Sequence, residues 1–70
     1  MARDDADKLR ILLSHWVEHN EDHAGEFTEW AARARAGGWG PVHDHMMKAV
    51  EQMKAANQSL LAALESLKEG

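Results

Sequence analysis

Seventy residues make one small domain, residues 1–70, and the absence of cysteine excludes disulfides, thiolate metal sites and cysteine nucleophiles. The net charge of −4 and the dispersed Lys and Arg residues argue against a nucleic-acid partner. No apolar run approaches the ~18 residues of a membrane span, and the N-terminal "MARDDADK" lacks the apolar centre of a secretory signal. We expect a soluble, cytoplasmic protein without a membrane partner.

The first predicted helix covers about residues 5–36, because the pattern runs without Pro as far as Gly37 and Gly38. Asp4 or Asp5 is placed to cap it. Steps of three and four residues predict a heptad seam, the stripe that faces the neighbouring helix. It contains Leu9, Leu13, Trp16, Asn20, His23, Phe27, Trp30 and Ala34.

The segment "AGGWGP" predicts a sharp turn at residues 37–40, closed by Trp39. Pro41 suits the first position of a second helix, which we expect over about residues 41–68. Its seam contains His43, Met46, Val50, Met53, Asn57, Leu60, Leu64 and Leu67. No alternation typical of strands is present, so the predicted fold is all-α, an antiparallel two-helix hairpin.

Folding the chain about its turn pairs residues whose numbers sum to about 77. This register sets Leu13 against Leu64, Trp16 against Leu61, Phe27 against Val50 and Asn20 against Asn57. Two asparagines in an apolar seam can hydrogen-bond to each other and fix the register. Apolar residues on the flanks, Leu12, Val17, Met47 and Leu61, are expected to stay partly exposed. We therefore predict a homodimer that forms a four-helix bundle.

Three histidines, His15, His19 and His23, recur every four residues in the first helix. Positions four apart share a helix face, so two imidazoles there can bind one ion. His15 and His23 lie ~12 Å apart along the axis, which leaves His19 and His23 as the better pair. Asp22 and Glu26 can add a ligand or orient a ring. Imidazole and carboxylate ligands suit Zn²⁺, Ni²⁺ or Co²⁺.

The main alternative makes His23 an ordinary core residue, hydrogen-bonded to Asn57 or Glu26, and the acidic neighbours a solvated helix face. His43 and His45 lie near Ala34 in the predicted hairpin, too far from His23 to complete the site within one chain. The sequence also lacks the Glu-x-x-His pattern of di-iron bundles, the H-E-x-x-H pattern of zinc proteases and a phosphate-binding loop after a strand. We therefore predict that the protein is not an enzyme.

The segments "HWVEHNEDHAGEFTEWA" and "AANQSLLAAL" resemble a small uncharacterised prokaryotic helical-hairpin domain, found alone or behind histidine-rich tracts. The resemblance covers nearly the whole chain. It centres on His19-Asn20 and His23-Ala24 in the first helix and Ala56-Asn57 in the second. It implies a metal-handling context, with nickel, cobalt or zinc. This chain departs from the longer members because no histidine-rich tract precedes its first helix.

The function predicted from these patterns is metal binding or metal buffering, with His19 and His23 as ligands and Glu26, Asp22 and His15 in support. Asn20 and Asn57 would orient the site. The alternative is a structural dimerisation or adaptor module that binds a protein partner without metal, and whose polar seam sets the register.

Overall fold

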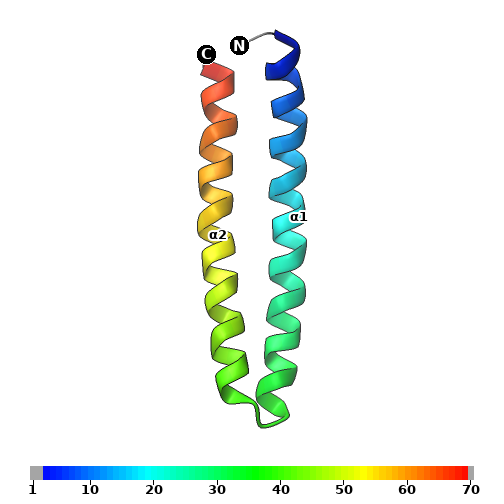
Figure 1. Cartoon of the computed structure of the whole chain (residues 1–70), viewed down its shortest axis with the longest axis vertical. Helices are drawn as coiled ribbons and strands as arrows, with labels where there is room; N and C mark the ends of the chain where they lie inside the picture. The colour runs from blue at the N-terminus through cyan, green and yellow to red at the C-terminus, as the bar shows by residue number, and fades with distance from the viewer. Residues whose placement is uncertain (1–2, 70) are drawn as a thin grey trace.

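The computed structural model describes residues 3–69, which form two antiparallel helices joined by a short turn (Figure 1). Helix α1 spans Arg3–Ala36 and helix α2 spans Gly40–Glu69. Residues 3–69 contain no strand, and the predicted all-α hairpin is confirmed. In this part of the chain neither helix has an apolar stretch long enough to cross a bilayer.

Helix α1 begins two residues before the predicted start, so Asp4 and Asp5 lie in its first turn instead of preceding it. Their carboxylates still lie near the positive end of the helix dipole. Arg33 and Arg35 lie in the last turn, where positive charge is favourable. These charges favour helix formation in a long segment whose packed face is narrow.

The turn is a Schellman motif. Trp39 N–H donates to the carbonyl of Ala34 at 2.9 Å, and Gly38 N–H donates to the carbonyl of Arg35 at 3.1 Å. Gly38 has φ +91°, a conformation that side-chain-bearing residues rarely adopt. The Trp39 ring packs on Gly37, where an added Cβ would lie 3.3 Å from the ring. Trp39 closes the turn in this way, although 64 % of it is exposed.

The seam on α2 agrees with the prediction, because each predicted residue is at least half-buried. Val50 and Asn57 are buried most completely. The seam on α1 differs from the prediction at two positions. Trp16 and Trp30 are 43 % and 58 % exposed, whereas the buried residues are Leu13, Val17, Ala24, Ala31 and Ala34. The predicted exposure of Val17 is therefore wrong, and Trp16 and Leu61, which the predicted register pairs, are both exposed.

The reason for this shift is the size of the side chains. Residues 16, 23 and 30 and residues 17, 24 and 31 form adjacent heptad stripes, and either set can face a neighbouring helix. Two of the three residues in the second set are alanines, Ala24 and Ala31, which let the backbones approach closely. Ala31 is completely buried. Tryptophan at both places would hold the helices farther apart, so the small residues pack against α2.

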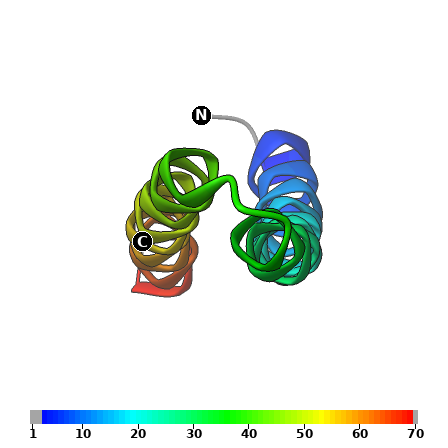
Figure 2. The same cartoon turned by 90° about the horizontal axis from the view of Figure 1, so that it is seen from below.

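The result is a long and thin molecule, 52 × 14 × 13 Å (Figure 1). Figure 2 looks along its length and shows the two helices side by side. Its radius of gyration is 16.0 Å, whereas a compact chain of this length has about 11 Å. Within the described residues the buried apolar side chains are six, and half of them are alanine: Leu13, Val17, Ala24, Ala31, Ala34 and Val50. A core of this size contributes little free energy toward folding.

Candidate functional site

An asparagine pair marks the middle of the hairpin. The Asn20 amide donates to the Asn57 side-chain oxygen at 2.9 Å, which confirms the predicted pairing. The Asn57 amide donates to the backbone carbonyl of Val17 at 3.1 Å. Asn57 is 7 % exposed, and no buried side-chain nitrogen or oxygen in the described residues is left without a partner. The pair fixes the register of the two helices at residue numbers that sum to 77.

Beside Asn20 on α1, the rings of His19 and His23 contact each other. Their Nε2 atoms are 2.8 Å apart, their ring centroids are 4.4 Å apart and the rings are T-shaped. In the absence of an ion, one ring donates its N–H to the bare nitrogen of the other. Asn57 is bonded to Asn20 and Val17, and the hydrogen-bond partner of His23 is His19.

This convergence is close to the geometry of a two-histidine chelate. Two imidazole nitrogens on one tetrahedral Zn²⁺ lie about 3.3 Å apart, given Zn–N distances of ~2.0–2.1 Å. The Nε2 atoms would separate by about half an ångström to admit the ion. His19 is exposed and His23 is half-buried, so a small rotation of the His19 ring is sterically open. The two rings thus have a spacing from which bidentate binding of an ion would need little rearrangement.

The other predicted ligands lie farther from this pair. The His15 ring centroid is 5.9 Å from that of His19, and Phe27 follows His23 at 6.0 Å. Asp22 and Glu26 are exposed. Within residues 3–69 no three His, Asp or Glu side chains gather closely enough to hold one ion. A single described chain therefore brings two ligands together, His19 and His23.

Near the turn, His43 Nδ1 lies 3.0 Å from a carboxylate oxygen of its neighbour Asp44. His45 is exposed. Neither residue belongs to a group of three candidate ligands in the described part of the chain.

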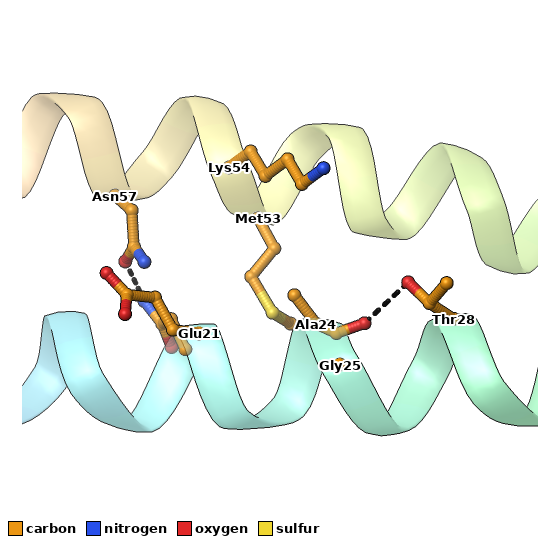
Figure 3. Close-up of a pocket in the computed structure, with 8 residues that line it drawn as sticks. Glu21, Ala24, Gly25, Thr28, Met53, Lys54 and Asn57 are labelled. Atoms are coloured by element: carbon orange, nitrogen blue, oxygen red, sulfur yellow. Dashed lines mark hydrogen bonds between the residues drawn. The ribbon is translucent and has the colours of Figure 1, made fainter.

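The hairpin has two long faces on either side of its seam. On one face a hollow of about 340 Å³ runs between the helices (Figure 3). Glu21, Thr28 and Lys54 line it, and Thr28 donates to the Ala24 carbonyl at 2.7 Å. Residues one heptad from Lys54 continue along the same side of α2. We call this side the charged face: Glu21 and Thr28 of α1, with Met47, Lys54 and Leu61 of α2.

The opposite side, by the same spacing, is the tryptophan face: Trp16, His23 and Trp30 of α1, with Ala49, Ala56 and Ala63 of α2. His19 lies at its edge. The Arg33 guanidinium stacks over the Trp30 ring at 4.6 Å from the centroid. We call Ala49, Ala56 and Ala63 the alanine stripe. It was not predicted from the sequence, although its heptad spacing is visible there.

A model of one protein family matches residues 9–67, which include most of both helices, the histidine pair and both asparagines. Its description is a domain of unknown function. Neither a curated protein nor a solved structure matches the chain. The match agrees with the predicted likeness to an uncharacterised small helical domain. The chain belongs to the family described as domain of unknown function DUF8180.

Proposed function

We propose that this protein binds a divalent transition-metal ion through His19 and His23 and acts in metal buffering, without catalysis. The observation that carries the proposal is the convergence of the two Nε2 atoms at 2.8 Å on one helix face. A histidine pair four residues apart needs no other element to hold it, because the helix itself sets the spacing. Helix α1 alone therefore holds these two imidazoles together, before any further ligand is added.

The charge around the pair supports cation binding. From Ile11 to Ala32 the chain has no Lys or Arg. Its acidic residues there are Glu18, Glu21, Asp22, Glu26 and Glu29. The resulting negative potential raises the local concentration of cations. Asp22 and Glu26, each three residues after a histidine, are placed to act as water-bridged or outer partners of the rings.

The ligand set indicates the class of ion. Imidazole binds Zn²⁺, Ni²⁺, Co²⁺ and Cu²⁺, and affinity alone favours copper. Two histidines without a thiolate favour an intermediate ion over a soft one. Our proposal therefore names Zn²⁺, Ni²⁺ or Co²⁺. Copper would compete for the same ligands wherever free copper is available to the protein.

The experiment is calorimetric titration of Zn²⁺ into the whole protein and into two variants that each lose two histidines. His19→Ala with His23→Ala should abolish uptake, while circular dichroism keeps the helical signal. The matched control, His43→Ala with His45→Ala, should bind as the parent does. If the first variant takes up zinc as the parent does, or if both variants lose it equally, the proposal is wrong.

A second function is favoured by a different observation, the exposed Trp16 and Trp30 beside a seam whose register is fixed by Asn20 and Asn57. We propose as the alternative a structural dimerisation or adaptor module that binds a protein through the tryptophan face and does not use metal. Changing Asn20 and Asn57 together to Leu should then alter the number of subunits or raise stability, with no effect of zinc on either. A change in subunit number that appears only with zinc contradicts this alternative.

A further inference from the structure

We propose that the tryptophan face binds a second copy of this chain, with the two turns at opposite ends of the dimer. In this arrangement His19 and His23 of both copies meet at the two-fold axis and hold one divalent ion with four imidazoles. The ion part of this inference rests on the proposed metal binding. The interface part stands on the packing alone and needs no metal.

The exposed area supports a protein partner on the hairpin. The chain exposes 5367 Å², whereas a compact monomer of 7.8 kDa exposes roughly 4,400 Å². The excess of roughly 1,000 Å² exceeds the ~800 Å² that each partner contributes to a stable interface of ordinary size. A second copy has the length and shape to cover this area along the whole hairpin.

The exposed tryptophans of α1 lie on one face, whereas the charged face exposes Leu61, at 47 %. Trp16 and Trp30 are 43 % and 58 % exposed, and Leu12 beside them is 41 % exposed. Tryptophan is strongly enriched at the centres of protein interfaces. In a four-helix bundle each helix buries a stripe that faces the bundle axis, between its two neighbours. On α1 this stripe contains Asn20, Phe27 and both tryptophans. It is wide enough for α1 to pack against two neighbouring helices, α2 and a helix of the second copy.

The register of the two helices favours turns at opposite ends. A two-fold axis perpendicular to the helices, placed at residue 21 of α1, sets His19 opposite His23 of the second copy. It also sets Leu12 opposite Trp30 of that copy. In the hairpin, residue 21 lies level with residue 56 of α2, because their numbers sum to the same 77 as those of the bonded pair Asn20 and Asn57.

The same axis therefore passes through Ala56 of α2. Ala49 then lies opposite Ala63 of the second copy, and Ala56 lies opposite itself. Ala56 and Ala63 are exposed in the hairpin and Ala49 is half-buried. Small side chains at all three contacts let the two α2 helices approach closely. The alanine stripe of α2 and the histidine pair of α1 thus share one symmetry axis.

The metal site is incomplete without this partner. One described chain supplies two imidazoles and no third ligand nearby. Tetrahedral zinc sites use four protein ligands when they are structural. The opposite orientation, with the turns at the same end, would place the tryptophans against the alanines of the other copy. It would also keep the two histidine pairs on different sides of the bundle, each with two protein ligands.

The orientation is tested by cross-linking, because the protein has no cysteine of its own. Ala56→Cys places a single thiol at the proposed axis, and Gln58→Cys places one on the charged side of the same helix. Both positions are exposed, so neither change disturbs the core. A disulfide requires a Cα–Cα separation of about 4.4–6.8 Å between its two cysteines. With chelator present and under mild oxidation, Ala56→Cys should form a disulfide-linked dimer, because the proposed axis brings the two copies of residue 56 together. Gln58→Cys should stay unlinked.

Native mass spectrometry of the unmodified protein with Zn²⁺ then gives the number of ions. One ion per two chains, with selective Ala56→Cys cross-linking, is the expected result. Equal cross-linking of both cysteine variants, or none, overturns the interface. One ion per chain overturns the four-histidine site while the proposed metal binding survives. Selective cross-linking without zinc uptake overturns the four-histidine site and the proposed function together.

Discussion

The two long faces of this hairpin use the same helices in opposite ways. The charged face has Glu21, Thr28 and Lys54 around an open hollow, with Met47 and Leu61 along the same side of α2. The tryptophan face carries Trp16, Trp30 and a row of alanines, which gain nothing from water. An antiparallel pair of helices covers only the stripe between these faces. The two faces therefore differ in the side chains that they expose: tryptophans and alanines on one, mixed polar and apolar side chains on the other.

The largest effect should come from truncating the tryptophans. Trp16→Ala with Trp30→Ala should weaken the proposed dimer at least 100-fold, because each central tryptophan contributes about 2 kcal/mol or more to such an interface. Sedimentation velocity over a range of concentrations measures the change. Met47→Ala with Leu61→Ala is the matched control on the charged face and should change the dimer dissociation constant less than about threefold. Equal weakening of the dimer by the two double variants would contradict an interface on the tryptophan face alone.

The asparagine pair in the seam comes next. Asn57→Leu should lower the free energy of unfolding by about 1–3 kcal/mol, since the Asn20 amide loses its partner in a half-buried place. Replacing both asparagines by Leu should recover that loss or exceed the parent, because two apolar residues leave no amide unpaired. Urea unfolding at one fixed protein concentration measures both. A double variant less stable than the single one would show that the amide pair itself stabilises the fold.

The position of the seam can be tested with alanines that differ by one residue. Ala31→Leu should cost about 1–3 kcal/mol, because Ala31 is completely buried and the added carbons have no space. Ala32→Leu, at an exposed position, should change the free energy of unfolding by less than about 0.5 kcal/mol. Thermal unfolding of the two variants gives the comparison. Equal costs for the two substitutions would contradict the burial of Ala31 against α2.

The smallest effect should be a gain. Gly25 lies inside α1 by the hollow, and an added Cβ would meet nothing within 4 Å. Gly25→Ala should raise the free energy of unfolding by about 1 kcal/mol from helix propensity. It should leave zinc uptake and the dimer constant unchanged, because the charged face stays open to water. A weaker dimer in this variant would indicate that the second copy binds the charged face, which contradicts our proposal.

Much of this architecture could be predicted from neighbouring residues. The "AGGWGP" segment contains the glycine that the turn conformation requires, and this requirement is local. The bonded pair Asn20 and Asn57 followed from the length of the two arms about that turn. The His19 and His23 pair followed from the helix repeat. Each of these features depends on chain geometry that is fixed once a residue is helical.

The tertiary structure alone decided which of two adjacent stripes of α1 faces α2. Hydrophobicity favours burial of Trp16 and Trp30, whereas steric fit favours burial of Ala24 and Ala31. A hydrophobic pattern in the sequence takes account of hydrophobicity and not of steric fit. Close packing of two helices rewards small side chains, so the alanines are buried and the tryptophans are left outside. That choice exposes Trp16 and Trp30, and it leaves His23 on the tryptophan face with His19 at the edge of that face.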